Sequence, residues 1–277
     1  MNGEKIFRWA GASLSLVVFG VLVWQENRRP LRRSVESKLN RDGRNLAVAG
    51  AAAIALQLTE APVANRLTKL VERKNWGLLK ILRLPRPLET ILAVALLDYT
   101  LYVWHYLTHR IPFLWRFHLV HHVDLDLDVT TAVRFHFAEL VISAAWRSAQ
   151  ILLIGVSPVS FAAWQMFLFP SILFHHSNVR LPLEFERKLR KFVVTPRLHG
   201  IHHSAVREET DSNWSSGLTV WDRLHGTYRE DVPQDEIIIG VPAYQNPNEL
   251  TLTKILPLPF KTQRPSWQML EAGKQLR

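Results

Sequence analysis

The sequence predicts an all-α integral membrane protein with about four to five transmembrane or interfacial helices and a cytosolic, histidine-rich helical cap. Three observations lead to this fold class. Several long apolar runs carry almost no charge, ten tryptophans are present, and all twelve histidines lie between residues 105 and 225. A helix that crosses a bilayer needs roughly 20 mostly apolar residues, and tryptophan favours the membrane–water interface.

The composition narrows the class of partner. The chain has 277 residues and a formal net charge of +10, which favours an anionic partner. Because apolar spans are present, anionic lipid is favoured over nucleic acid. The absence of cysteine excludes disulfide frameworks, thiolate metal sites and cysteine nucleophiles, and nothing marks a secreted, oxidised compartment.

The first expected span covers residues 6–24. Lys5 and Arg8 precede it as in a signal peptide, but no small-residue cleavage site follows Trp24, so we expect a retained helix. A basic linker follows, with seven Lys or Arg between Gln25 and Asn45. The second span, 46–58, is short and rich in alanine.

Residues 62–87 carry seven more Lys or Arg around an apolar segment, which is typical of an amphipathic helix lying in the interface. Residues 1–87 are therefore interpreted as N-terminal membrane helices with a basic interfacial linker. Further spans are expected at 88–107, 137–155 and 159–174, with a break at Ser157-Pro158. Prolines beyond residue 229 predict that the extension 230–277 is a strap over the cap, with 255–260 dipping into the interface.

This topology places the histidine clusters on one side of the membrane. His105 and His109 close the third span, and the short turn at Ser157-Pro158 returns His175 and His176 to the same face. The positive-inside rule makes this face cytoplasmic, given the basic 25–45 linker. The equally basic 62–87 stretch conflicts with that orientation unless it is interfacial or re-entrant.

The histidine spacing indicates metal ligands. His105 and His109 form an i, i+4 pair, and the pattern HxxHH occurs at 118–122 and again at 199–203, so the rings in each group share a helix face. Neutral imidazole binds iron, zinc, copper and nickel. Eight or more imidazoles exceed the need of one tetrahedral zinc. They suit two metals, each with four or five imidazoles and one position open for O₂.

Other polar residues are expected around this site. Asp98 lies two helical turns before His105 inside a span, where it is predicted to accept the second N–H of a ligand histidine; the alternative is a helix–helix hydrogen bond. Glu139 is expected to pair with His136, which is either a ligand or a group lining the substrate path. His225 is interpreted as a surface residue. Three carboxylates are expected in a solvated loop: Asp124, Asp126 and Asp128.

The motifs resemble those of the fatty acid hydroxylase superfamily, specifically its sterol desaturase branch, over residues 88–228. The matching segments are Asp98-x3-Tyr102-x2-His105-x3-His109, residues 114–122, residues 130–139, Phe174-His175-His176-Ser177-Asn178, residues 195–204 and residues 221–227. The chain departs from the usual pattern at Phe137 (usually proline), at Ser215 (usually glycine) and at His225 (usually phenylalanine). Residues 88–229 are thus expected to form the catalytic domain.

The resemblance implies two Fe ions and O₂-dependent hydroxylation, desaturation or oxidative demethylation of a lipid: a sterol, a fatty acid or a related isoprenoid or alkyl lipid. Electrons would come from a separate donor (a reductase, ferredoxin or cytochrome). Zinc, which can substitute in isolated protein, cannot change its oxidation state. The catalytic face is expected to be cytoplasmic, in a bacterial inner membrane or one like the endoplasmic reticulum.

The resemblance also assigns residues. The implied ligands are His105, His109, His118, His121, His122, His176, His199, His202 and His203. Their expected supporting neighbours are Asp98, His136, His175 and Asn178.

Two other classes of function remain open. A non-catalytic membrane metal-binding protein is one, although transport predicts ligands strung across the spans. A zinc-dependent membrane hydrolase is the other, needing only three ligands and a general base. Heme ligation by paired histidines would leave HxxHH unexplained.

Overall fold

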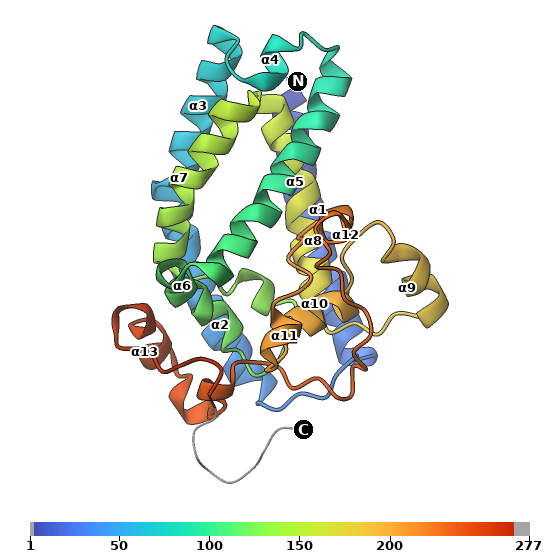
Figure 1. The fold of residues 1–277 in the computed structure, drawn as a ribbon, viewed down its shortest axis with the longest axis vertical. Coiled ribbons are helices and arrows are strands. Elements are labelled where there is room, and N and C mark those ends of the chain that lie inside the picture. Colours follow the sequence, from blue (N-terminus) through green and yellow to red (C-terminus); the bar gives the residue numbers. More distant parts are fainter. Residues whose placement is uncertain (1–2, 269–277) are drawn as a thin grey trace.

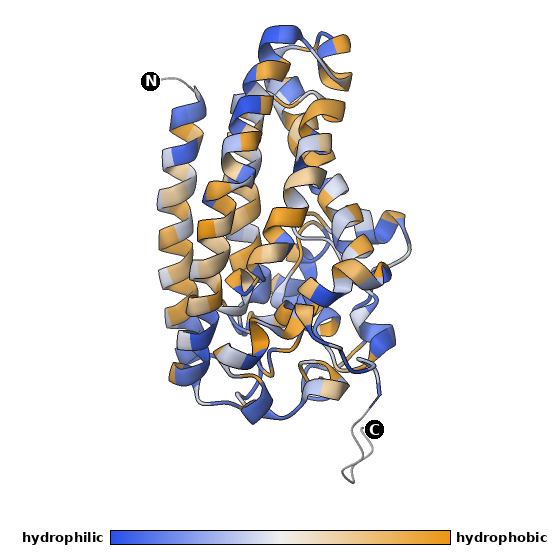
Figure 2. Cartoon of the chain, turned by 90° about the vertical axis from the view of Figure 1, so that its left-hand side faces the viewer, coloured by the Kyte–Doolittle hydropathy of each residue, from blue (hydrophilic) through white to orange (hydrophobic). Residues whose placement is uncertain are grey.

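The computed structural model describes residues 3–268, and the regular elements there are all helical (Figure 1). Four helices are long and apolar enough to cross a membrane: Gly3–Arg28 (α1), Lys38–Ile81, Arg86–Arg110 (α5) and Phe137–Ile154 (α7). Their residues are mostly apolar along the middle of the bundle and hydrophilic towards its two ends (Figure 2). The predicted all-α integral membrane fold is confirmed.

The second span is longer than expected. Its helices α2 (Lys38–Leu58) and α3 (Glu60–Lys74) meet at Thr59, and both pack against α7. Helix α3 buries Ala64, Thr68 and Val71 on one face, and α4 (Leu78–Ile81) follows at the far end of the bundle (Figure 1). Helix α3 therefore lies along the bundle with its apolar face on α7, and the interfacial interpretation of 62–87 stays a prediction.

Helix α8 (Pro158–His176) forms where the fifth span was expected, but it is not among the four candidate spans. It packs against α1 and α5 and buries Ala162, Ala163, Trp164 and Leu168. Its apolar residues are therefore largely covered by protein, and α8 completes the interior of the bundle.

Two glycine turns make the far end of the bundle compact. Gly77 (φ +97°) and Gly155 (φ +84°) approach so closely that a Cβ built on Gly77 would lie 2.3 Å from the Gly155 Cα. Ser157 then caps α8, because its side chain accepts a hydrogen bond from the Ser160 amide. The tight turn reverses the chain, and α8, packed on α1 and α5, brings His176 back to the end where α5 finishes.

The cap gathers at that end from short helices (Figure 1). They are α6 (Pro112–His122), η1 (Thr131–Val133), α9 (Leu183–Leu189), α10 (Pro196–His202), α11 (Arg207–Thr210) and α12 (Val220–Leu224). The C-terminal segment adds η2 (Pro242–Tyr244), η3 (Pro247–Glu249), α13 (Leu252–Ile255) and η4 (Leu258–Phe260).

The C-terminal segment packs as a strap on α6 and α2. Its Val241, Leu250 and Ile255 share one apolar core with Val48 and Leu119. The expectation that 255–260 dips into the interface is wrong for Ile255, which is fully buried, whereas Phe260 is exposed.

The loop of three aspartates is buried, contrary to expectation. Arg41 of α2 donates to Asp124 Oδ1 (3.0 Å) and to Asp128 Oδ2 (2.6 Å), while Asp126 accepts the amides of Val35 and Glu36. An isolated buried charge is costly, so these carboxylates and the arginine stabilise one another. The loop between α6 and η1 is thereby fixed to the start of α2.

Candidate metal centre

Nine histidines converge at the cap end in two groups. In each group, one ligand atom from every member lies within 4.8 Å of the others. The first group contains His105, His109, His118, His122 and His202; the second contains His121, His176, His199 and His203. These are the nine residues named as ligands from the sequence, and the structure brings them all together.

The spacing of the histidines along each helix decides which of the two groups they join. Each i, i+4 pair joins a single group: His105 with His109, His118 with His122, and His199 with His203. The odd member of each HxxHH motif joins the other group, since it lies on a different part of the helix face. Helices α6 and α10 consequently supply histidines to both groups.

The ring nitrogens of the first group point at a common centre. The Nε2 atoms of all five members are buried without a hydrogen-bond partner. Three of the opposite nitrogens have acceptors: His105 Nδ1 lies 2.7 Å from the Trp214 carbonyl oxygen, His202 Nδ1 2.8 Å from that of Ser212, and His118 Nδ1 2.9 Å from Glu139 Oε1. A ring that donates from Nδ1 keeps its Nε2 lone pair for a metal.

The second group is tighter. His176 Nε2 lies 3.0 Å from both His121 Nε2 and His199 Nε2, and His203 Nε2 lies 3.2 Å from His199 Nε2. Two nitrogens about 2.1 Å from one ion and at right angles to each other would be about 3.0 Å apart. His176 Nδ1 donates to the Ile172 carbonyl oxygen (2.8 Å), which leaves its Nε2 unprotonated. The spacing therefore fits imidazoles that share an ion.

Burial keeps these imidazoles neutral. Desolvation lowers the pKa of His202 to about 3, and it also lowers the pKa values of His121, His122 and His203 well below the usual histidine range. Metals bind the neutral ring, so the histidines are ready to coordinate at neutral pH. Both groups consist of nitrogen donors alone. Such a donor set suits iron, zinc, copper or nickel rather than magnesium or calcium.

Two other histidines adjoin the groups without joining them. The His175 ring centroid lies 4.1 Å from that of His199, the position of a neighbour that was expected. His136 caps α7 by accepting the Ala138 amide, and its Nε2 donates to the Leu256 carbonyl oxygen of the strap. Glu139, expected to pair with His136, instead bonds to His118.

Asp98 does not bond a ligand histidine. Its Oδ2 accepts hydrogen bonds from the Leu218 amide (3.0 Å) and the Trp221 indole (2.7 Å), so it attaches the 213–228 loop to α5. The expectation of support for a ligand ring is thus replaced by a tertiary hydrogen bond. His225 is exposed, and its ring stacks on those of Tyr99 and Tyr102, which also belong to α5.

Asn178 is linked to α10 through Arg32. Its side chain exchanges two hydrogen bonds with the Arg32 backbone, and the Arg32 guanidinium donates to the Pro196 carbonyl oxygen at the start of α10. A Cβ on Gly200 would lie 2.2 Å from Arg32 Nη1, so the arginine lies against the ligand helix. Burial lowers the pKa of Arg32 to about 10, a value that leaves it charged at neutral pH.

The sequence predicts the wrong partner for Glu139, and it does not predict the roles of Arg32 or of the carbonyls of Ser212 and Trp214. Asp222 fixes the last of these by accepting the amides of Trp214 and Ser215. The signal in the sequence is the segment Asn213-Trp214-Ser215, where the chain departs from the usual motif at Ser215.

The family model for fatty acid hydroxylases matches residues 90–227, which contain all nine converging histidines. The chain belongs to the fatty acid hydroxylase family. It is 32% identical over 161 residues to the ornithine lipid hydroxylase OlsE of Rhizobium tropici, covering 57% of this chain and 46% of that protein.

Other members of the family are more distant. Human alkylglycerol monooxygenase is 25% identical over 197 residues, covering 68% of this chain and 43% of that protein. Human cholesterol 25-hydroxylase is 25% identical over 147 residues, covering 50% of each. The chain spans about half or less of the length of these relatives. No solved structure gives a significant match.

Proposed function

We propose that this chain is a non-heme di-iron oxidoreductase that uses O₂ to hydroxylate or desaturate a membrane lipid. The single observation that best supports this proposal is the pair of adjoining groups of five and four histidines, buried at one end of a bundle of membrane helices. The relatives are named for hydroxylation or monooxygenation of ornithine lipid, alkylglycerol and cholesterol. These substrates are all lipids, so the substrate class assigned here is a sterol, fatty acid or related isoprenoid or alkyl lipid.

Iron is the metal that fits the reaction. Zinc has no redox chemistry. Two irons can supply the electrons needed to cleave O₂ and to oxidise an unactivated C–H bond. Hydroxylation balances as RH + O₂ + 2e⁻ + 2H⁺ → ROH + H₂O. Desaturation consumes the same electrons and protons but releases two waters as a CH₂–CH₂ unit becomes CH=CH. A separate reductase, ferredoxin or cytochrome is the proposed electron donor.

The protein's own groups prepare this site. Five Nε2 lone pairs in the first group and four in the second would hold the ions, oriented by the hydrogen bonds of the opposite nitrogens. Phe135 stacks on His121 with ring centroids 4.6 Å apart and a 9° interplanar angle, which covers that imidazole with an apolar face. Such cover keeps bulk water from the reacting centre.

Metal analysis tests the proposal directly. Protein purified without oxygen from iron-replete cells should contain about two irons per chain and give the Mössbauer spectrum of a coupled pair. Zinc alone in such protein would falsify the di-iron assignment and favour the membrane hydrolase. Two irons without any O₂-dependent lipid product would favour the non-catalytic metal-binding protein.

The substrate is best found by comparing lipids from cells with and without the gene, grown in air. A lipid that lacks one oxygen or one double bond in the deletion strain identifies it. His202→Ala should fail to restore that lipid while still entering the membrane, and His225→Ala, outside both groups, should restore it.

We further propose that the metal centre faces the cytoplasm, in a bacterial inner membrane or one like the endoplasmic reticulum. The 25–45 linker, with seven basic residues, lies at the cap end. Because the chain lacks cysteine, Asn248→Cys on the exposed strap gives a unique label. A membrane-impermeant maleimide should react with it only after the membrane is opened; reaction in intact cells would reverse the orientation.

A further inference from the structure

Large apolar side chains are exposed on the cap outside the four spans. Leu183 and Phe185 of α9 are each 55% exposed, and Phe192, three residues after α9, is 69% exposed. On α12, Val220 and Leu224 are exposed as well. Grouped exposed apolar residues mark a contact with a membrane or another protein.

The two segments form one surface, here called the shoulder and defined as residues 183–192 with 218–224. The Thr219 amide donates to the Phe192 carbonyl oxygen (3.0 Å), and the Arg223 guanidinium donates to the Arg190 carbonyl oxygen (3.4 Å). These bonds hold α12 beside the end of the α9 segment. The exposed apolar residues therefore belong to a single built feature.

Backbone hydrogen bonds fix residues 178–180, which lead into one edge of the shoulder, beside the end of α1. The Arg180 amide donates to the Arg29 carbonyl oxygen (2.9 Å), and the Leu31 amide donates to that of Asn178 (2.7 Å). Helix α1 is a candidate span that ends at Arg28, whose guanidinium lies 4.5 Å from the ring centroid of Trp24. A tryptophan beside arginines is typical of the membrane–water interface.

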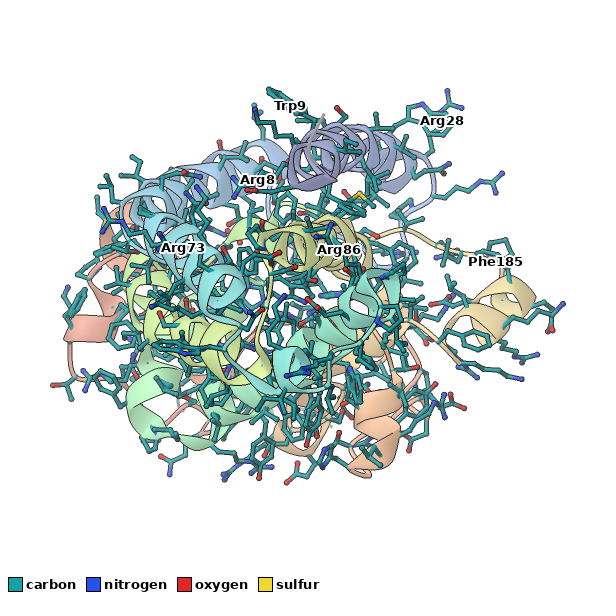
Figure 3. The ribbon with its side chains drawn as sticks, turned by 90° about the horizontal axis from the view of Figure 1, so that it is seen from above. Arg8, Trp9, Arg28, Arg73, Arg86 and Phe185 are labelled. Carbon is teal, nitrogen blue, oxygen red and sulfur yellow. The ribbon has the colours of Figure 1, made fainter. Side chains whose placement is uncertain are left out.

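The other edge lies along a span. Trp221 of α12 bonds to Asp98, and its ring centroid lies 5.0 Å from that of Tyr99; both partners belong to α5. Helix α9 projects sideways from the bundle (Figure 1), and Phe185 points outward from the protein when viewed from above (Figure 3). The shoulder thus lies at the side of the bundle, beside α5.

The net charge of the shoulder indicates what kind of surface it contacts. Residues 183–192 contain four basic side chains (Arg187, Lys188, Arg190 and Lys191) and two acidic ones (Glu184 and Glu186), a net charge of +2. Basic and apolar side chains on a short helix are characteristic of an interfacial segment that binds an anionic leaflet. Helix α9 has seven residues and is too short to span.

We propose that the shoulder is a second, non-spanning membrane contact, which inserts Leu183, Phe185, Phe192 and Leu224 into the anionic leaflet on the histidine side. The segment connects α8, which carries His176, to α10, which carries His199 and His202 and is followed directly by His203. Insertion holds this connection against the bilayer. Lipid in that leaflet then lies beside the cap.

The absence of cysteine allows a direct depth measurement. Phe185→Cys, Phe192→Cys and Leu224→Cys would each carry a nitroxide in the full-length protein, reconstituted in nanodiscs of phosphatidylglycerol and phosphatidylethanolamine. Accessibility to O₂, which partitions into lipid, is compared with accessibility to a water-soluble nickel chelate. Leu16→Cys on the lipid-facing side of α1 and Asn248→Cys on the strap provide the lipid and water references.

The shoulder labels should favour O₂ over the nickel chelate at values between the two references. Nickel accessibility equal to that at residue 248, at all three positions, would overturn the proposal and leave the surface for a protein partner. The charge is tested by Lys188→Glu with Lys191→Glu in the Phe185→Cys background. The label should become shallower in anionic nanodiscs; an unchanged depth would contradict the preference for anionic lipid.

Discussion

A histidine binds a metal through one ring nitrogen while the other keeps its proton, so the acceptor of that proton decides which nitrogen is free. In the first group the acceptors come from three separate segments: Trp214 and Ser212 supply carbonyls, and Glu139 supplies a carboxylate. The carboxylate is the strongest of these acceptors because it is charged. It is also the acceptor whose charge a single substitution can remove.

Glu139→Gln should therefore weaken retention of the metals by roughly 10–100-fold, the usual effect of removing a partner of a ligand histidine. The change keeps the size of the side chain but replaces an anionic acceptor with a neutral amide opposite His118 Nδ1. Retention would be measured as iron remaining after competition with a chelator. Unchanged retention would show that Glu139 does not orient His118.

Asp98→Asn provides the matched control, because it is also a buried carboxylate in the 90–227 region but bonds to Leu218 and Trp221. It should lower the melting temperature in detergent while iron retention stays close to that of the parent. The two variants separate metal binding from tertiary stability.

At this scale the sequence predicted residue types better than their partners. The resemblance assigns His176 rather than His175, and helical spacing indicates the other eight ligands because i, i+3 and i+4 positions share a face. Spacing could not identify the partner of Glu139, since His118 lies 21 residues away across a loop, nor the link from Asn178 through Arg32, which spans 146 residues. Such pairs depend on how helices pack.

Among the elements, the buried loop after α6 depends on charge. Burial alone would raise the pKa of Asp128, but the Arg41 and Lys38 charges and the hydrogen bonds from Arg41 and Thr130 lower it below its usual range. A carboxyl whose pKa is lowered on folding adds stability above its unfolded pKa of about 3.9 and loses it as the pH falls through the folded value.

Asp128→Asn should destabilise the protein by about 3 kcal/mol at pH 7, since removing one partner of a buried pair leaves an uncompensated charge. The difference in melting temperature between the variant and the parent should stay constant down to about pH 4 and shrink below that pH. Exposed Asp235→Asn serves as the control. A difference that closes between pH 7 and pH 5 would contradict the lowered pKa of Asp128.

The glycine turns lead to a prediction at the opposite end. Gly77 has φ +97° and ψ 169°, a backbone region that costs other residues about 1–3 kcal/mol, and a Cβ there would also overlap Gly155. Gly77→Ala should lower the melting temperature and the yield of folded protein. Gly50→Ala, in α2 with open space around it, should slightly raise the melting temperature. Equal effects of the two would refute the role of the turn.

Element types were predictable where hydropathy alone decides them, as in α1, α5 and α7. For α3 the basic residues predict an interfacial helix, whereas its buried Ala64 and Val71 belong to the same apolar core as Ile151 and Ile154 of α7. The three aspartates, which the sequence predicts to be solvated, are buried against Arg41, which lies 83 residues from Asp124 in the sequence. Long-range partners change what a local pattern means.

At the scale of the whole molecule, the metals should contribute to folding. The nine histidines come from α5, α6, α8, α10 and the residue after it, and bound ions would join these segments. Ligands that bind only the folded state add about 2.7 kcal/mol at 100 times their dissociation constant. Chelation should therefore lower the melting temperature by several degrees, and added iron should restore it. His225→Ala should respond to chelator like the parent protein, and His202→Ala should respond less.

The division of α6 and α10 between the two groups has a consequence for how the ions load. An ion in either group would order the same two helices, and that ordering would already be complete when the second ion arrives. Loading should thus be cooperative, with few chains holding a single ion at intermediate iron concentrations. Native mass spectrometry during an iron titration should show empty and doubly loaded chains as the main species.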